Sequence, residues 1–152
     1  MNSKFVQLEI RDHDSLMKAC DLLHDARCDV STIALDRSAG SWTALFRREF
    51  FEDPELMQAE PRLFILTKHT FPLVSSQLTL HDFTSYEIED RSHIGTYMFN
   101  ECRLIGDTYH LWFCEDMRII LRFRDKPHGE LRDLNLLGEK GSFFTFRNLF
   151  KR

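Results

Sequence analysis

The fold is decided by residues 98–124, which read MFNECRLIGDTYHLWFCEDMRIILRFR. Gly106-Asp107 is typical of a two-residue hairpin turn with glycine in the first position. Such a turn places Ile105 opposite Thr108, and the rest of the register follows from that pair. The further pairs that this register predicts are Leu104 with Tyr109, Cys102 with Leu111, and Asn100 with Phe113.

A second turn extends the hairpin to three strands. Residues 115–117 form the predicted loop, which places Phe113 opposite Ile119. Because side chains alternate between the two faces of a strand, one face becomes continuously apolar. We expect all six of its residues to be buried, namely Tyr109, Leu111, Phe113, Ile119, Leu121 and Phe123. The opposite face is mixed and carries Phe99, Glu101, Arg103, Ile105, His110, Trp112, Ile120, Arg122 and Arg124.

The apolar residues of this mixed face are the first candidate interface. Phe99, Ile105, Trp112 and Ile120 lie on it in the predicted register. A contiguous apolar patch that stays exposed is typical of a protein-binding surface. If a helix covers the same face, the case for an interface there weakens.

The rest of the chain predicts one amphipathic helix and several more strands. Apolar residues recur every three or four positions from Ser15 to Arg27, with Asp12 or Asp14 as the N-cap. Alternation predicts strands at 5–10, 30–36, 42–51, 63–70, 74–80 and 84–89. Turn residues predict a turn at 38–41, a short helical turn at 54–59 and a loop at 126–129. Residues 131–137 are compatible with either a strand or a short helix.

These elements predict an α+β fold. We expect a mainly antiparallel, strongly bent sheet or half-barrel of about eight strands, with the N-terminal helix packed on one side or closing one end. The 152 residues predict a single domain over 1–152, long enough to bury a core of its own. The 14 Phe, 3 Tyr and 2 Trp supply large side chains for that core.

The C-terminal segment 140–152 is basic and aromatic, and it is the second part of the candidate interface. It holds four basic residues and no acid, whereas the rest of the chain carries a net charge of −8. Phe143, Phe146 and Phe150 are spaced as one stripe of a helix that would dock on the domain or on a neighbouring chain. A final strand from Ser142 to Phe146 is the slightly favoured alternative. In both cases we expect these aromatic side chains to be buried, because exposed ones promote aggregation.

Metal, cofactor and nucleophile sites have no clear pattern in the sequence. Cys102 lies on one face of the predicted sheet and His110 and Cys114 on the other. His110 and Cys114 are four residues apart on a strand, about 13 Å, which is too far to share one ion. Acidic or dipole surroundings disfavour a thiolate at Cys28 and Cys114, and Cys20 faces the core. We therefore expect four free thiols, no metal and no cofactor.

Paired carboxylates are the one catalytic alternative. Glu87 and Glu89 share a strand face, and acid–base work would need a cleft that joins one of them to another titratable group. Acids that alternate with apolar residues more often mark the solvated side of a half-buried strand.

Several classes of partner are disfavoured. The net charge of −4 argues against nucleic acid, although Arg47-Arg48 lies among aromatic residues. We see no leader and no apolar run long enough to span a membrane. Four scattered cysteines are typical of a reducing compartment, so we expect a cytoplasmic protein.

Three stretches resemble a family of short, uncharacterised bacterial proteins known only as a domain of unknown function. They are Leu22-Leu23-His24-Asp25-Ala26 at the end of the first helix, Leu45-Phe46-Arg47-Arg48-Glu49-Phe50-Phe51-Glu52 in an aromatic strand, and Leu131-Arg132-Asp133-Leu134 near the end of the sheet. The resemblance implies a compact cytoplasmic bacterial protein. It supplies no reaction, ligand or catalytic residue.

Together these patterns favour a non-enzymatic binding or interaction module. Its partner would be another protein or a second copy of the chain, in a self-association such as a homodimer. A small hydrolase that uses strand carboxylates is the alternative.

Overall fold

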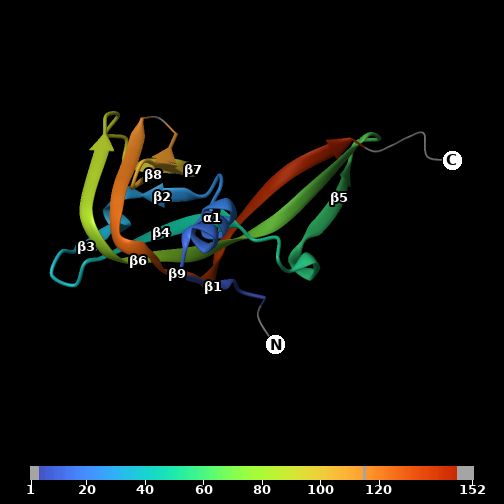
Figure 1. Ribbon diagram of the computed structural model, residues 1–152. Helices are drawn as coiled ribbons and strands as arrows, with labels where there is room; N and C mark the ends of the chain where they lie inside the picture. Colours follow the sequence, from blue (N-terminus) through green and yellow to red (C-terminus); the bar gives the residue numbers. More distant parts are fainter. Residues whose placement is uncertain (1–3, 115, 147–152) are drawn as a thin grey trace.

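The computed structural model describes residues 4–114 and 116–146 (Figure 1). In this part of the chain, nine strands form one antiparallel sheet, accompanied by one α-helix and two short 3₁₀ helices. In chain order the elements are β1 (Gln7–Ile10), α1 (His13–Leu22), β2 (Arg27–Asp29), η1 (Val30–Thr32), β3 (Ala34–Asp36), β4 (Ser41–Glu49), η2 (Pro54–Leu56), β5 (Gln58–Arg62), β6 (Leu66–Asp90), β7 (Thr96–Ile105), β8 (Thr108–Phe113) and β9 (Met117–Phe146).

The sheet bends until it closes on itself. The closed path runs β9-β8-β7-β2-β4-β6, and the pairing of β6 with β9 returns it to its start. β1, β3 and β5 attach to β9, β4 and β6 from outside this ring. Within residues 4–114 and 116–146, the predicted antiparallel sheet with a single α-helix is confirmed, and its bend is complete enough to make a six-stranded barrel.

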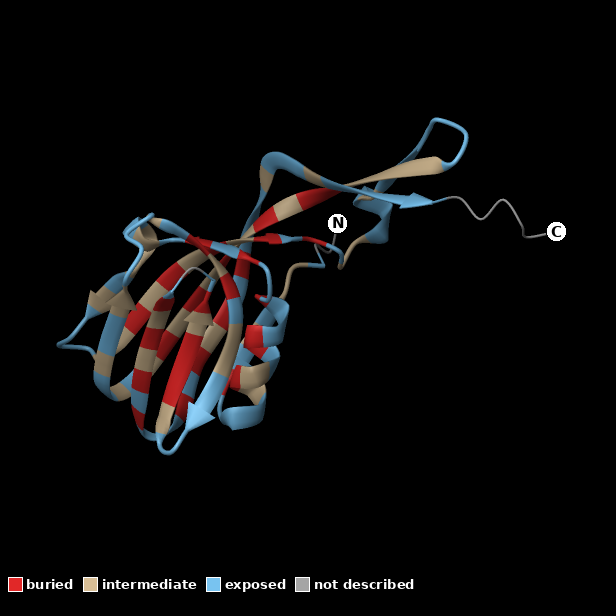
Figure 2. Ribbon diagram, turned by 90° about the horizontal axis from the view of Figure 1, so that it is seen from above, coloured by how far each residue is buried: buried red, intermediate tan, exposed pale blue. Residues whose placement is uncertain are grey.

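The core lies inside the barrel, where Figure 2 shows the buried residues in red. Trp42, Ala44 and Phe46 alternate inward along β4 and are buried. α1 joins the same core through Leu16, Ala19 and Cys20 on its apolar face. The largest fully buried side chains include Trp42, Tyr97, Phe46, Phe50 and Phe99.

The N-terminus of α1 is fixed by a capping box. Asp12 accepts a hydrogen bond from the backbone N–H of Ser15 at 2.8 Å, and the Ser15 hydroxyl accepts one from the backbone N–H of Asp12 at 3.1 Å. The Ser15 hydroxyl also donates to the Asp12 carboxylate at 2.6 Å. This hydrogen bond and the one from the Ser15 backbone N–H lower the pKa of Asp12, which favours its charged form near the positive end of the helix. The helix ends at Leu22, earlier than the predicted Arg27, because the chain turns there to enter β2.

The predicted three-stranded segment 98–124 is present as β7, β8 and the first part of β9, but its second hairpin has a different register. Ile105 lies opposite Thr108 as predicted, and all six residues expected on the apolar face are buried. In the second hairpin, Phe113 pairs with Met117 and Leu111 with Ile119, so the predicted register was wrong by two residues. A shift of two residues leaves every side chain on its predicted face, which is why the burial pattern survived.

The prediction for Phe99 was wrong. A bulge between Phe99 and Glu101 makes Asn100 the extra residue, so Phe99 rather than Asn100 lies opposite Phe113. The bulge turns Phe99 into the core, where it is fully buried. Its ring packs edge-on against Phe113 with ring centroids 5.3 Å apart. Phe99 is therefore a core residue and no part of an interface.

The largest departure from the sequence prediction is the length of β6 and β9. β6 continues from Leu66 to Asp90 through Pro72, where three separate strands at 63–70, 74–80 and 84–89 were expected. β9 continues through residues 126–129, where a loop was expected. Register shifts along β6 and β9 allow both strands to bend without ending. Two shorter segments also differ, because residues 30–32 form a 3₁₀ helix in place of a strand and residues 58–62 form β5 in place of the end of a helical turn.

Gly129 lies where β9 passes close to the backbone of β6. A Cβ atom there would lie 2.0 Å from the backbone oxygen of Thr79, at a φ of +159°. We expect Gly129→Ala to lower the free energy of unfolding by about 2 kcal/mol or more, because backbone must move to admit the methyl group. Gly138→Ala is the matched control, since a Cβ at Gly138 meets nothing within 4 Å. Equal costs for the two variants in urea titrations would contradict this reading of the crossing.

Candidate functional site

A three-stranded arm projects from the barrel (Figure 1). It consists of β5, residues 66–71 of β6 and residues 140–146 of β9, with the connection 63–65 at its tip. β6 lies between the other two strands, so the arm sheet has the order β5-β6-β9. We call this unit the arm.

A bulge at the base of the arm accounts for its departure from the barrel. Val74 pairs with Leu136 and Pro72 pairs with Lys140, so β9 holds two more residues than β6 between these pairs. Unequal strand lengths of this kind bend a sheet and increase its twist. Gly141 lies just beyond, and the ring of Phe71 lies where a Cβ of Gly141 would be, at 2.2 Å.

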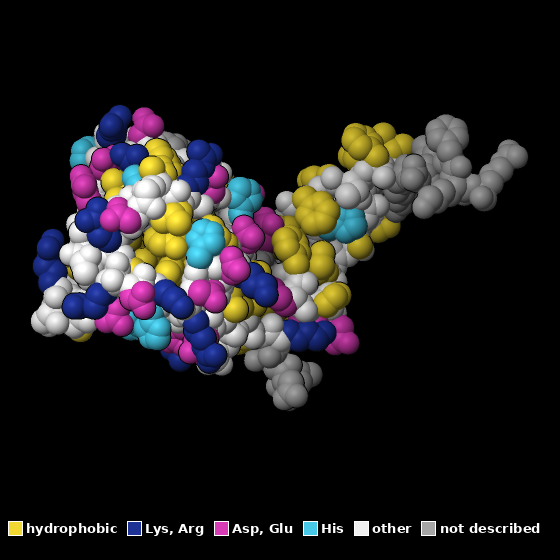
Figure 3. Space-filling view, viewed as in Figure 1, with side chains coloured by type: hydrophobic (Ala, Val, Ile, Leu, Met, Phe, Trp, Pro, Cys, Tyr) yellow, Lys and Arg dark blue, Asp and Glu magenta, His cyan; other side chains and the backbone are white. Residues whose placement is uncertain are grey.

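The arm exposes large apolar side chains to solvent. Leu63 is 79% exposed, Phe64 92% and Phe146 80%. Ile65, Phe143 and Phe144 are exposed as well, and Figure 3 shows hydrophobic side chains gathered along the arm. Apolar residues this concentrated outside a core are typical of interaction surfaces. The arm is therefore the first candidate for a binding site.

The two faces of the arm differ in character. On one face, the His69 ring stacks on Phe143 with centroids 4.7 Å apart and an interplanar angle of 11°, and His69 Nε2 lies 2.7 Å from the Thr145 hydroxyl. On the other face, Phe144 and Phe146 lie opposite Lys68 and Leu66 of β6. The first face is partly organised by its own contacts, whereas Phe144 and Phe146 have most of their surface in solvent.

The C-terminal segment forms the predicted strand up to Phe146, but its aromatic side chains are not buried as predicted. Residues 142–146 pair with β6, so the predicted docking helix was wrong for this stretch. Phe143 and Phe146 are exposed because the barrel core is already filled by other residues. Phe150 lies outside the described residues.

The mixed sheet face is a second, separate surface. Ile105 is half exposed, Trp112 and Ile120 are intermediate, and α1 joins the core on the opposite side of the sheet. The Arg118 guanidinium lies 4.6 Å from the Trp112 ring centroid and forms an ion pair with Glu89 at 2.5 Å. Arg118 thus covers part of Trp112, and Ile105 is the one exposed residue of the three.

The surroundings of His110 on this face disfavour its charged form. Burial lowers its pKa, and the nearby Arg118 lowers it further. Its Nε2 lies 3.0 Å from the Thr108 hydroxyl, and its ring stacks beside Trp112. These contacts account for His110 as part of the packed strand.

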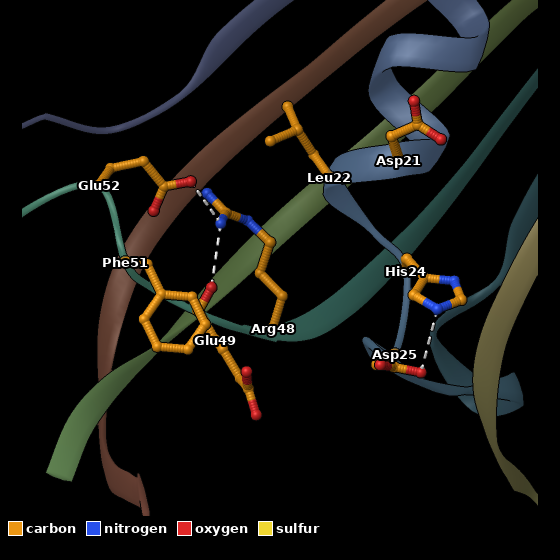
Figure 4. A pocket seen from close by; sticks show the side chains of 8 residues that line it. All are labelled: Asp21, Leu22, His24, Asp25, Arg48, Glu49, Phe51 and Glu52. Atoms are coloured by element: carbon orange, nitrogen blue, oxygen red, sulfur yellow. Dashed lines mark hydrogen bonds and ion pairs between the residues drawn. The ribbon is translucent and has the colours of Figure 1, made fainter. Parts of the chain in front are cut away.

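A cleft of about 460 Å³ lies between the end of α1 and the end of β4 (Figure 4). Its walls carry the carboxylates of Asp21, Asp25, Glu49 and Glu52. Burial and the charge of Asp25 raise the pKa of Glu49. Within residues 4–114 and 116–146, no group of three or more His, Cys, Asp or Glu is arranged to hold a metal ion.

Arg48 is committed to a structural network behind this cleft. It donates to Glu52 Oε1 at 2.7 Å and to Asp133 Oδ2 at 2.6 Å. Ser76 Oγ donates to Asp133 Oδ1 at 2.6 Å, and the backbone N–H of Val6 donates to Oδ2 at 2.8 Å. The network connects β4, β6 and β9 with Val6, the residue that precedes β1, so its main role is to hold these strands together where the arm begins.

The three stretches on which the family resemblance rests meet at this cleft. Leu22 and His24 come from the first, and Arg48 and Glu52 come from the second. Asp133, from the third, is the ion-pair partner of Arg48. Residues far apart in the sequence thus build one polar junction.

The carboxylates predicted for the enzymatic alternative do not line this cleft. Glu89 is paired with Arg118, and Glu87 is exposed on the outer face of the sheet. The cysteines are free thiols, with Cys20 and Cys28 buried and Cys114 exposed. Burial raises the pKa of Cys28 to about 12, so its thiol stays protonated and a poor nucleophile.

Sequence reasoning missed the tip of the arm. Leu63, Phe64 and Ile65 are apolar and contiguous, and the predicted strand 63–70 begins with them. The one signal that separates a tip from a core strand is the flanking Pro61, because proline is confined to edges and turns.

No family model matches the chain, and searches of curated proteins and of solved structures found no match either. The described part of the chain also has no helix that is both long and apolar enough to cross a lipid bilayer. The arm is therefore the feature of the molecule that best indicates a function.

Proposed function

We propose that this protein is a non-enzymatic interaction module that associates with a second copy of itself through the arm. One observation carries the proposal, which is the exposure of Leu63, Phe64 and Phe146 on a projecting sheet. Burial of apolar surface is the main driving force of association, and aromatic residues are enriched where binding energy concentrates. We place the module in a reducing, cytoplasmic setting because its thiols are free.

The continuity of the arm with the barrel supports a second copy as the partner. Phe143, Phe144 and Phe146 belong to β9, which runs from the barrel into the arm, so every copy of the chain presents the same surface. Identical rigid surfaces related by a twofold axis bury the same patch on both copies.

The test is the mass of the full chain in solution, measured by light scattering at micromolar concentration. We expect a dimer for the wild type and a monomer for the triple variant Phe64→Ser, Phe144→Ser, Phe146→Ser. The triple variant should still unfold cooperatively as a folded monomer, because these side chains lie outside the core. Its unfolding midpoint should fall only by the stability that dimer formation adds to the wild type at the same protein concentration.

Ile105→Ser is the matched control, since Ile105 is half exposed on the mixed face of the barrel. This variant should remain dimeric. A monomeric wild type would overturn the proposal, and so would a dimer that is lost on Ile105→Ser but kept in the triple variant.

A further inference from the structure

The two edges of the arm sheet differ in whether another strand can join them. β5 carries Glu60, Pro61 and Arg62, and Arg62 forms an ion pair with Glu60 at 3.0 Å. Proline lacks the N–H that a neighbouring strand would need, and charged side chains discourage strand addition. The β5 edge is therefore blocked.

The edge formed by β9 has none of these protections. Residues 141–146 read GSFFTF, without a charged residue or a proline. The edge of β9 that faces away from β6 is covered in its earlier part. β1 pairs with residues 129–132 on that edge, and the backbone N–H of Asp133 donates to the carbonyl of Val6. From residue 134 to 146, the described residues provide no strand on this side. An apolar, β-prone strand with one open side is a template for pairing.

We infer that the open β9 edge pairs antiparallel with the β9 edge of a second copy, about a twofold axis, to form a closed dimer; the inference rests on the proposed self-association. Each copy has one open edge and one blocked edge. When the two open edges pair with each other, no open edge remains in the dimer, so the assembly stops at two chains. The product is a continuous six-stranded arm with the order β5-β6-β9 in each half.

The side chains on the edge strand suit this arrangement. Phe144 and Phe146 lie on one face of the arm, and a twofold axis through the sheet places the same two residues of the second copy on that face. Four phenylalanine rings then meet across the new strand pair. Aromatic cross-strand neighbours stabilise antiparallel pairs beyond the area they bury.

Cysteine cross-linking tests the strand pairing. Single cysteines are placed in turn at positions 142–146, in a chain where the accessible Cys102 and Cys114 are changed to serine. Oxidised glutathione is the oxidant, and each new disulfide reduces one molecule of it to two thiols. We expect a covalent dimer from the positions at the twofold axis, and a yield that falls on either side of them.

Gln58→Cys and Ala59→Cys on β5 are the matched controls and should stay monomeric on denaturing gels. A dimer by light scattering with no cross-link from any β9 position would overturn the edge pairing and leave self-association standing. A monomer by light scattering would overturn both. Cross-linking through β5 would overturn the assignment of the open edge.

Unblocking β5 tests why the assembly stops. The variant Glu60→Thr, Pro61→Val, Arg62→Thr gives each chain two open edges, so we expect soluble or insoluble species much larger than a dimer. If this variant stays dimeric, the blocked edge has no part in closure and the inference fails.

Discussion

Replacing Arg48 with methionine is expected to lower the free energy of unfolding by about 3–5 kcal/mol, the usual cost of removing one partner from a buried ion pair. The Arg48 side chain is 4% exposed and that of Asp133 is fully buried. Methionine keeps much of the volume but leaves the Asp133 carboxylate without its cation. Asp133→Asn should cost a similar amount, because the Arg48 charge then stays buried beside a neutral amide.

The double variant Arg48→Met, Asp133→Asn separates the charge effect from packing. It buries neither charge of this pair, and the asparagine oxygen can still accept from the backbone N–H of Val6. We expect its cost to be well below the sum of the single variants, with a coupling of about 1–3 kcal/mol in urea titrations. Additive costs, or a single variant that costs under about 1 kcal/mol, would mean that the network contributes little to stability.

Leu111→Ala is expected to cost about 2–5 kcal/mol, the range for truncating a fully buried leucine. Leu111 lies at the centre of β8, between Cys102 of β7 and Ile119 of β9, and has no exposed surface. The barrel closes around this position, so the cavity left by alanine has little freedom to collapse.

Leu104→Ala is the control for this second variant, because Leu104 belongs to the adjoining strand and is 46% exposed. Its cost should be under about 1 kcal/mol. Both are measured by denaturant unfolding at equal protein concentration, since dimer formation makes stability depend on concentration. A cost below about 0.5 kcal/mol for Leu111→Ala would show that the barrel centre is not tightly packed.

Alternation along residues 109–123 was sufficient to predict which side chains face the core, because the side-chain period of a strand survives an error of two residues in register. The helix was also predictable from the spacing of its apolar residues, and the structure selects Asp12 over Asp14 as its N-cap. The bulge at Asn100 could not be predicted from pattern alone. It depends on the backbone of Asp25 and Ala26, which bonds to Phe99 from across the fold.

The candidate site was only partly predictable for a similar reason. Phe143 and Phe146 were singled out by their spacing, but an aromatic strand has the same local pattern whether a core or solvent surrounds it. Exposure follows from the bulge at Pro72 and Lys140, which carries the strand away from a barrel that is already full. A proline within a strand pattern normally predicts that the strand ends there. β6 nevertheless continues through Pro72, because its pairing with other strands of the sheet holds it extended.

The arm also has a mechanical consequence. β6 and β9 run without interruption from the barrel into the arm, so no linker allows the arm to swivel. A flexible tether would have to be ordered on binding, and that ordering costs free energy. Here the orientation is fixed by the same hydrogen-bond ladder that closes the barrel. The arm is a stiff lever, and a load applied at its tip is carried directly into the backbone pairs of β6 and β9.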